Sequence, residues 1–308
     1  MEVKYISWSG YNNYGDDEPV KIIGQLGFEF NNEAENLMIG AGTMIPPSII
    51  FEPEIYSPYY KNKIVFCSGV ENPEFPVPEF ESRIKKFKHH FKDNEFVGLR
   101  CEKDKEILGF GEVIGDPLYL VNIKEKAKIE VPSKNKVLIN IGQSKSKVWG
   151  GLDAELNTIK TMCKFINELK KTEDVLLFCV WNNDIPFAEM IATSTKTKLF
   201  TGPHSLENIF SLVDNAKYVI SYKLHSMITA LSTNTPVIPI EYRPKIKDVA
   251  RDFGIDNLCI KTSNLSIELL FKKIAQLKHW DYEKINKKKL ELQNKLNEFV
   301  RKVQTRCS

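Results

Sequence analysis

The sequence predicts an α/β protein built from two doubly wound domains, and three observations lead to this fold class. The chain has 308 residues, about twice the roughly 150 residues of an average domain. Short apolar runs alternate with segments of helical periodicity, a pattern typical of parallel sheets covered by helices. At residues 131–135 (VPSKN) the apolar periodicity lapses, which indicates a linker. We therefore expect domains over residues 1–131 and 132–280, followed by a C-terminal helix over 281–308 that packs back on the body.

The N-terminal half contains four expected strands and three expected helices. The strands are the short apolar runs at 3–8, 37–43, 63–68 and 96–99. A first helix is expected from Pro19, because proline is favoured at the first position of a helix. Apolar residues at helical spacing predict a second helix over 79–92, with a basic outer face, and a shorter third one over 103–108.

The second half repeats this alternation more regularly. The expected strands lie at 136–141, 174–180, 198–201, 218–221 and 236–241. The expected helices lie at 152–170, 186–192, 205–213 and 225–232. Ser205 is of a residue type that caps helix N-termini. Residues 281–304 carry apolar side chains at steps of three, four and seven, which predicts one long amphipathic helix.

Composition and charge exclude several classes of protein. With 42% hydrophobic and 27% charged residues, the chain is of the ordinary globular type, and its net charge of +3 is too small for wholesale nucleic-acid binding. From residue 261 onward, however, 12 Lys and Arg stand against 5 Asp and Glu. Two interpretations remain open: the solvated face of a terminal helix, or contact with an anionic membrane surface or a lipid-linked substrate.

The chain also lacks sequence signals of export, membrane insertion and metal binding. No apolar run approaches the ~18 residues of a membrane span, and the N-terminus lacks a charged leader with an apolar stretch. The six cysteines lie far apart without paired spacing. We expect a cytoplasmic protein with at most peripheral membrane contact, with buried thiols and neither a metal site nor a cofactor.

The loop after the strand at 218–221 is the strongest candidate for a binding site. Ligands of open α/β sheets bind beyond the carboxyl ends of the strands. Here Lys223, His225 and Ser226 lie where a helix begins, so free backbone N–H groups, with Lys223 and His225 as side-chain donors, would favour a phosphate. The same spacing is compatible with a His225 that only caps the helix and a solvated Lys223.

Two further strand-to-helix turns carry candidate groups. Glu241, Arg243 and Lys245 follow the next strand, and Arg243 is suited to forked contact with a carboxylate or phosphate. Ordinary surface charges are the alternative. His204, in the turn 202–205, is a third candidate for a ligand contact.

The N-terminal loop after the first strand offers a possible acid or base. Asp16, Asp17 and Glu18 are consecutive carboxylates, and their repulsion would raise the pKa of one of them. A solvated acidic loop that caps the helix from Pro19 is the alternative. Gly40 and Gly42 would allow close backbone approach to a ligand, although the third glycine of a dinucleotide fingerprint is missing.

Several short motifs follow one another along the chain. They are Asn13-Tyr14-Gly15-Asp16-Asp17, Ile39-Gly40-Ala41-Gly42-Thr43, Arg100 with Asp116-Pro117, residues 218–240 (YVISYKLHSMITALSTNTPVIPI), Arg243-Pro244-Lys245 and Phe253-Gly254. In this order they resemble the polysaccharide pyruvyltransferase family, in which Asn-x-Gly-Asp and a Gly-rich loop precede a strand leading into Arg-Leu-His, a helix, a Gly-x-Pro strand and Pro-Lys. The chain departs from that pattern at three places: Lys223 replaces the Arg, Arg243 replaces an acidic or small residue, and Asn234-Thr235 precedes Pro236 in place of the usual Gly.

The resemblance implies a fold, a reaction and roles for the candidate residues. The fold would be GT-B-like, with two Rossmann-like domains facing across a cleft and the acceptor on the N-terminal side. The reaction would transfer pyruvate from phosphoenolpyruvate, the donor substrate, to a sugar of a cell-surface polysaccharide or its precursor, free or lipid-linked. It would form a ketal and release phosphate.

The implied roles divide the candidates into two groups. His225, Asp16, Asp17 and Glu241 would be catalytic. Lys223, Ser226, Arg243, Lys245, His204, Asn13, Gly15, Gly40 and Gly42 would bind substrate. Two other functions share these features: a GT-B glycosyltransferase with a nucleotide-sugar donor, whose ribose or base Glu241 would bind, and a non-catalytic relative that binds a phosphate or a sugar.

Overall fold

The computed structural model describes residues 1–73, 79–121, 132–143 and 151–307. For residues 151–154 it describes the backbone only. Within this range the chain forms two compact units. The first unit comprises Met1–Tyr11, Asp16–Val121 and Lys288–Ser308, and the second comprises Asn12–Gly15 and Asn122–Lys287. A four-residue segment near the N-terminus therefore belongs to the second unit. Part of the expected linker, residue 131, lies outside the described residues.

The first unit contains a six-stranded sheet in the order β2-β1-β3-β4-β5-β6, in which every strand pairing is parallel. The strands are β1 (Glu2–Ile6), β2 (Glu29–Phe30), β3 (Asn36–Ile45), β4 (Asn62–Val70), β5 (Val97–Leu99) and β6 (Glu112–Val113). With β1 between β2 and β3, the sheet is doubly wound and its strand order reverses between β1 and β3. The two-residue edge strands β2 and β6 are too short to show a hydrophobic pattern, so the sequence did not predict them.

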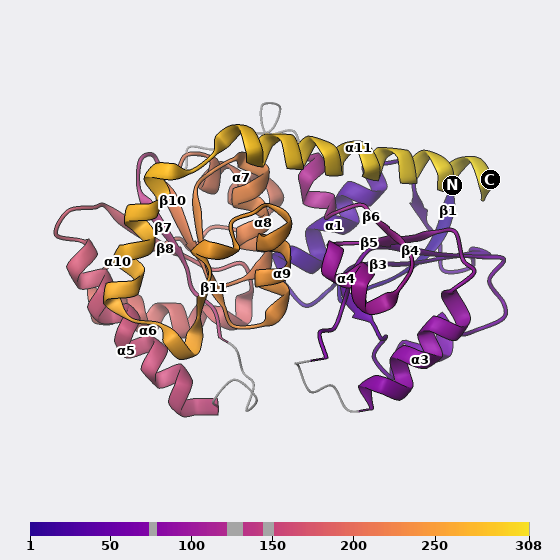
Figure 1. The fold of residues 1–308 in the computed structure, drawn as a ribbon, viewed down its shortest axis with the longest axis horizontal. Helices are drawn as coiled ribbons and strands as arrows, with labels where there is room; N and C mark the ends of the chain where they lie inside the picture. The colour runs from indigo at the N-terminus through magenta and orange to yellow at the C-terminus, as the bar shows by residue number, and fades with distance from the viewer. Residues whose placement is uncertain (74–78, 122–131, 144–150, 308) are drawn as a thin grey trace. The chain divides into compact units, whose positions relative to one another are not determined.

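Helices cover both faces of this sheet (Figure 1). They are α1 (Tyr14–Gln25), α2 (Glu52–Ile55), α3 (Phe80–Phe91), α4 (Glu102–Leu108) and α11 (Tyr282–Arg306), with a 3-10 turn at Pro117–Leu120. Successive strand residues face opposite sides. Leu37 of β3 packs in a cluster with Phe87 of α3, whereas Met38 packs with Phe299 of α11.

The start of α1 corrects one sequence expectation. The helix begins at Tyr14, and Pro19 lies inside it. Asp16 and Asp17 are therefore part of the first helical turn, where the helix dipole favours negative charge, and not part of a loop. The Asn13 side-chain oxygen accepts from the Gly15 N–H at 3.3 Å, which satisfies a donor at the start of the helix. The helix therefore begins before Pro19, the first position that the proline preference indicated.

The second unit contains another all-parallel six-stranded sheet, in the order β12-β11-β10-β7-β8-β9. The strands are β7 (Val137–Asn140), β8 (Val175–Phe178), β9 (Lys198–Leu199), β10 (Tyr218–Ser221), β11 (Val237–Glu241) and β12 (Ile260–Lys261). This is the strand order of dinucleotide-binding folds, and its topological switch point lies between β7 and β10. The expected strands are all present, and the edge strand β12 is additional.

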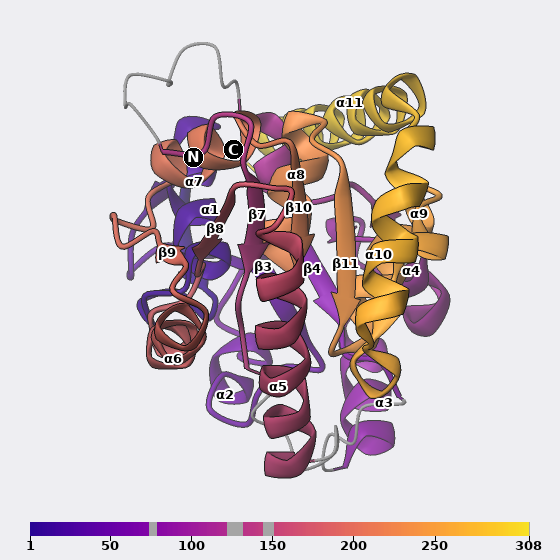
Figure 2. The ribbon, with the colours of Figure 1, turned by 90° about the vertical axis from the view of Figure 1, so that its left-hand side faces the viewer.

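Two layers of helices cover this second sheet (Figure 2). One layer contains α5 (Gly151–Leu169), α6 (Ile185–Thr195) and α10 (Ile267–Gln276), and the other contains α7 (Leu206–Asp214), α8 (Leu224–Thr233) and α9 (Pro244–Asp252). The expected cap of α7 is confirmed, because Ser205 Oγ accepts from the Asn208 N–H at 3.3 Å. The sequence did not predict α9 or α10.

The long C-terminal helix is present as expected. α11 runs over Tyr282–Arg306, and its buried residues Leu296, Phe299 and Val303 complete one face of the first unit's core. Among the described residues, no helix combines the length and the apolar character needed to span a bilayer.

Candidate active site

The carboxyl ends of β7 and β10 meet at the topological switch point of the second sheet. Ser221, the last residue of β10, pairs in register with Asn140, the last residue of β7. Asn140 Oδ1 accepts from the Lys223 N–H at 2.8 Å, and Ser221 Oγ donates to the Lys223 carbonyl at 2.8 Å. The turn that leads from β10 into α8 is therefore fixed from both sides.

The Lys223 side chain is buried and engaged within the protein. Its Nζ lies 3.2 Å from Oδ2 of the fully buried Asp184 and donates to the Gln143 carbonyl at 2.8 Å. It also stands 5.1 Å from the ring centroids of both Trp181 and Tyr242. The sequence predicted the cation but not these partners. Asp184 supplies a full negative charge that balances the lysine.

Gly142 explains how Lys223 reaches this position. A Cβ at Gly142 would overlap the Lys223 side-chain carbons, so a side chain there would displace the lysine. Neither Gly142 nor Asp184 carries a sequence signal of its own. Their importance depends on the loops after β7 and β8 lying side by side.

His225 is the second residue of α8 and only 9% exposed. A Cβ on Gly15 would overlap the His225 imidazole ring, so only glycine lets the backbone approach the ring this closely. The neighbouring Tyr14 is anchored by its N–H to the Val180 carbonyl at 2.9 Å and by its hydroxyl, 3.1 Å from Thr229 Oγ1. Asn13 and Trp181 form an isolated antiparallel β-bridge. The structure thus brings together two candidate motifs that are far apart in the sequence.

The first turn of α8 offers unsatisfied donors at the same place. The first N–H groups of a helix have no intrahelical acceptor, and the helix dipole favours an anion beside them. Ser226, the third helical residue, is fully buried, and its Oγ has no hydrogen-bond partner among the described residues. This arrangement is suited to a phosphate or a carboxylate.

The residues after β11 lie at the same edge of the sheet, because β11 pairs directly with β10. Glu241 ends β11 and is buried, while Arg243 is the N-cap of α9 and Lys245 lies in its first turn. Tyr242 stacks on Tyr222 with ring centroids 5.4 Å apart and also borders Lys223. These candidates therefore lie beside the start of α8.

His204 is not joined to this group. It follows β9, which is separated from β10 by β7 and β8, a distance of three strand spacings of about 4.8 Å. Burial lowers its pKa below the usual value, so the imidazole is neutral at pH 7 and supplies no cation there.

In the first unit, Asp16 of α1 lies close to Gly42, which is part of β3. A Cβ on Gly42 would lie 2.9 Å from Asp16 Oδ1, so the glycine makes room for this carboxylate. The Gly10 N–H donates to the Asp17 side chain. Gly40 lies within β3, where a Cβ would be 3.0 Å from the Phe66 carbonyl and the Tyr5 ring, so it serves strand packing.

Arg100 is a further candidate, which the sequence indicated only through the family resemblance. It follows β5, is 2% exposed, and none of its guanidinium nitrogens has a hydrogen-bond partner among the described residues. Burial alone would lower its pKa, but the charges of Asp104, Cys101, Asp116 and Glu71 hold it above the usual value. A buried guanidinium without a hydrogen bond is costly, so a ligand that accepts hydrogen bonds from it would be stabilising.

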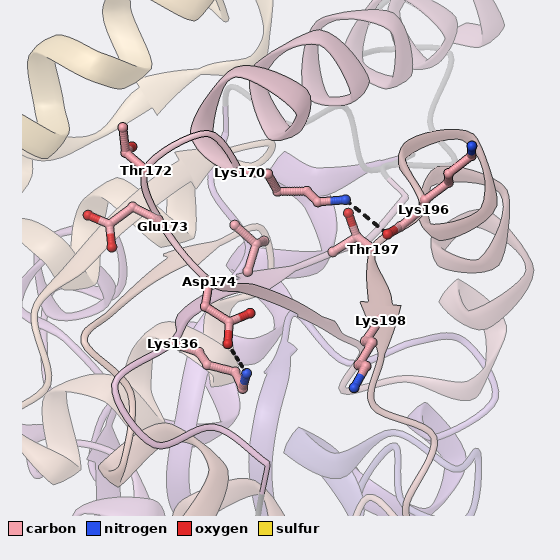
Figure 3. A pocket seen from close by; sticks show the side chains of 9 residues that line it. Lys136, Lys170, Thr172, Glu173, Asp174, Lys196, Thr197 and Lys198 are labelled. Carbon is pink, nitrogen blue, oxygen red and sulfur yellow. Dashed lines mark hydrogen bonds and ion pairs between the residues drawn. The ribbon is translucent and has the colours of Figure 1, made fainter.

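A separate cavity of about 490 Å³ lies at the opposite, amino-terminal edge of the second sheet (Figure 3). It is lined by Lys136, Lys170, Thr172, Glu173, Asp174, Val175, Lys196, Thr197 and Lys198. Lys136 bonds to Asp174, and Lys170 donates to the Thr195 and Lys196 carbonyls. No candidate residue from the sequence lines this cavity, and it is not part of the candidate active site.

All six cysteines are described and free of disulfides. In the described ranges, no three His, Cys, Asp or Glu side chains are grouped so that they could hold a metal ion.

Comparisons with solved structures show the fold. The α,α-trehalose 6-phosphate synthase of Burkholderia multivorans is 8% identical, with a TM-score of 0.52 over 88% of this chain and 72% of that one. The α,α-trehalose-phosphate synthase (UDP-forming) of Burkholderia vietnamiensis is also 8% identical, with a TM-score of 0.50 over 94% of this chain and 74% of that one. The α/β architecture is accordingly that of GT-B glycosyltransferases. No curated protein matches the chain.

One family model matches more than half of the chain. It is described as polysaccharide pyruvyl transferase and covers residues 81–244, from α3 to the first residue of α9. The matched segment includes Arg100, the switch point of the second sheet and His225, but not the motif at 13–17. The chain therefore belongs to the polysaccharide pyruvyl transferase family.

Proposed function

We propose that this protein transfers pyruvate from phosphoenolpyruvate to two hydroxyls of a sugar, forming a ketal and releasing phosphate. The acceptor would be a cell-surface polysaccharide or its precursor. Membership of the family supports the transferase class. The observation that carries the donor assignment is the first turn of α8, where His225 and the buried Ser226 hydroxyl lie at the switch point of the second sheet.

The donor has two anionic groups, and the second unit offers two sets of donors for them. Backbone N–H groups and Ser226 at the start of α8 suit the phosphate. Arg243, at the start of the adjacent α9, suits the carboxylate through its planar fork. We assign Lys223 a positioning role, because Asp184 already balances its charge and a substrate anion would have to compete with that carboxylate.

The reaction needs a proton donor and a proton acceptor. The donor's methylene carbon takes one proton and becomes a methyl group, which leaves an oxocarbenium-like carbon for the first hydroxyl to attack. The carbon–oxygen bond to phosphate then breaks, and the second hydroxyl attacks in its place. One hydroxyl proton balances the new methyl group and the other leaves with phosphate, so no oxidant or reductant is consumed.

The proposed acid and base come from His225, Asp16, Asp17 and Glu241. His225 borders the anion site, and Glu241 ends the neighbouring strand. Asp16 and Asp17 lie in the first turn of α1. We also propose that Arg100 binds an anionic group of a substrate, and that the protein is cytoplasmic, because phosphoenolpyruvate is made there.

Thermal unfolding with candidate donors tests this proposal. Phosphoenolpyruvate at 100 times its Kd should add about 2.7 kcal/mol, which raises the melting temperature by roughly 5–10 °C. His225→Ala should abolish the shift, while His279→Ala, an exposed residue of the second unit, should retain it. The unliganded melting temperature of each variant checks its folding.

Phosphate release in the presence of a panel of acceptor glycans completes the test. Release that requires both donor and acceptor is the expected result. Stabilisation by UDP-sugars but not by phosphoenolpyruvate would replace this proposal with a nucleotide-sugar transferase. Donor binding without phosphate release for any acceptor would favour a non-catalytic binding protein.

A further inference from the structure

The loop between β1 and α1 carries aromatic side chains that contact one another. Trp8 and Tyr11 lie in this loop, with ring centroids 6.3 Å apart and ring planes inclined at 55°. Trp8 also meets Phe51, which follows β3, edge to face with centroids 5.0 Å apart. Aromatic pairs at such separations attract one another. The three rings therefore connect the loop after β1 to the segment after β3, within the first unit.

Tyr11 is the exposed end of this row of rings. It is 58% exposed, whereas Trp8 and Phe51 are half-buried. Both of these partly buried rings pack against the core cluster of the first unit that includes Leu37. The Tyr11 ring therefore rests on a support that is fixed to the core. We call Trp8 and Tyr11 the aromatic platform.

The backbone is constrained on both sides of Tyr11. Gly10 has a φ of 92° and Asn12 a φ of 52°, so both neighbours of Tyr11 lie at positive φ. For a side chain such as that of Asn12, this conformation costs free energy, and residues held in this way cluster at ligand sites. The Gly10 N–H also donates to the Asp17 side chain, which fastens the loop to the first turn of α1.

The aromatic platform lies at the topological switch point of the first sheet. The strand order reverses between β1 and β3, and ligands of doubly wound sheets bind beyond the carboxyl ends of the strands at such a point. Ile6 ends β1 and pairs with Ile39, so β3 continues past it. On this continuation, a Cβ at Gly42 would lie 4.0 Å from Trp8 Cδ1 and 2.9 Å from Asp16 Oδ1. A carboxylate therefore borders the same glycine as the platform.

We propose that the aromatic platform binds a pyranose ring of the carbohydrate acceptor. The C–H groups on one face of the sugar stack on the Tyr11 ring, and the Asp16 carboxylate accepts a hydrogen bond from a sugar hydroxyl. Small-molecule sites combine aromatic walls with a few polar groups in this way, whereas a stable protein interface needs a larger apolar core. Membership of the polysaccharide pyruvyl transferase family supports a sugar as the occupant. The inference rests on the proposed function for its acceptor, but not on phosphoenolpyruvate as the donor.

Saturation-transfer-difference NMR tests the proposal with the full chain and without a donor. The probes are the methyl pyranosides of glucose, galactose and mannose and their 2-acetamido counterparts. At least one should bind the wild type. Irradiation of aromatic protons should then saturate mainly the C–H groups of one face of the sugar, because stacking places that face on the Tyr11 ring. Absence of binding for every probe would overturn the proposal, and so would equal saturation of both faces.

Two substitutions at Tyr11 separate the ring face from the hydroxyl. Tyr11→Ala should weaken binding of the best probe about tenfold, because the stacking contact is lost. Tyr11→Phe keeps the ring and should stay within about twofold of the wild type. An equal loss in the two variants would show that the hydroxyl binds the sugar, and stacking would be wrong. Unchanged binding in Tyr11→Ala would overturn the proposal as well.

Tyr59 provides a matched control in the same unit. It is 61% exposed and its ring centroid lies 5.2 Å from that of Tyr60, so it matches Tyr11 in exposure and in having an aromatic neighbour. Tyr59→Ala should leave sugar binding within about twofold of the wild type. A loss equal to that of Tyr11→Ala would show that sugars bind to exposed tyrosines in general, which would contradict a specific platform. Circular dichroism melting of each variant confirms folding.

Donor binding distinguishes failure of this inference from failure of the proposed reaction. Tyr11→Ala should keep the thermal shift with phosphoenolpyruvate, because Tyr11 belongs to the first unit and His225 and Ser226 to the second. If the wild type binds sugar through Tyr11 but is not stabilised by phosphoenolpyruvate, the inference holds and the donor assignment is wrong. If the wild type is stabilised by phosphoenolpyruvate but binds sugar independently of Tyr11, only the inference is wrong.

Discussion

Glycines at two positions set the geometry of the candidate site. Gly15 lies against the imidazole of His225, and Gly142 lies against the side chain of Lys223. In each case a glycine makes room for a side chain at the start of α8. The glycine of the Asn-x-Gly-Asp motif therefore has a packing reason that comes from the second unit, although it stands near the N-terminus of the chain.

A pair of glycine substitutions in α1 separates this packing role from helix propensity. Gly15→Ala should displace His225, lower the free energy of unfolding by about 1–3 kcal/mol through overpacking, and suppress donor binding. Gly24→Ala, in the same helix, meets only Phe30 at 3.9 Å and should gain about 0.5–1 kcal/mol from helix propensity. Urea unfolding with donor titration measures both. Equal stability changes in the two variants would contradict the packing argument.

Between elements, a carboxylate of α2 pairs with two side chains of α3. Glu52 accepts from Lys86 and Arg83, and its side chain is 17% exposed. Burial would raise the pKa of Glu52, but hydrogen bonds and charge from Lys86 and Arg83 outweigh it and hold the pKa below its usual value. This contact between α2 and α3 therefore depends on an ionised Glu52.

This lowered pKa predicts a pH-dependent contribution to stability. Because the folded pKa lies below the unfolded one, the contribution is fully present above the unfolded value of about 4.5 and is lost as pH falls through the folded pKa. Glu52→Gln should cost about 1 kcal/mol at pH 7. The difference from the wild type should shrink as the pH falls below about 4.5 and through the folded pKa. A difference that is constant between pH 7 and pH 3, measured by urea unfolding, would contradict the ion-pair role.

At the scale of the whole molecule, the C-terminal helix packs against the N-terminal part of the chain. α11 returns to the first unit, where Leu296, Phe299 and Val303 pack with N-terminal core residues such as Val3 and Met38. The C-terminal residues therefore complete the first sheet's hydrophobic face. Both α1 and α11 have residues in each unit.

Substitutions on opposite faces of α11 test this packing. Phe299→Ala removes a side chain that is 1% exposed and should cost about 3–5 kcal/mol, with faster amide exchange in β3 and β4. Leu290→Ala, at 47% exposure on the same helix, should change stability by less than about 0.5 kcal/mol. Hydrogen exchange resolved by segment measures both. Unchanged protection of β3 and β4 in Phe299→Ala would show that α11 does not support that core.

Local sequence patterns determined much of the fold. The strand at 218–221 has the same bounds in the structure, and the following helix differs from the expected 225–232 by one residue at each end. Such agreement is expected where an apolar run, a turn and a helical repeat follow one another, because each signal is contained in neighbouring residues. The two-residue strands β2, β6 and β12 carry no such signal. The start of α1 was mispredicted because the local preference of Pro19 gave way to contacts of Asn13 and Tyr14.

For the site, the sequence by itself determined the chemical types and the strand ends that carry them. Glu241 ends one of two adjacent parallel strands, and His225, Ser226 and Arg243 follow them, so topology alone brings these residues to one edge. Only the tertiary structure decided which partners each group meets. Asp184 engages Lys223, Gly15 packs on His225, and the Arg100 guanidinium is enclosed without a hydrogen bond to any described residue. The physical reason is that burial and pairing depend on contacts between segments far apart in the chain, which no local pattern of residues encodes.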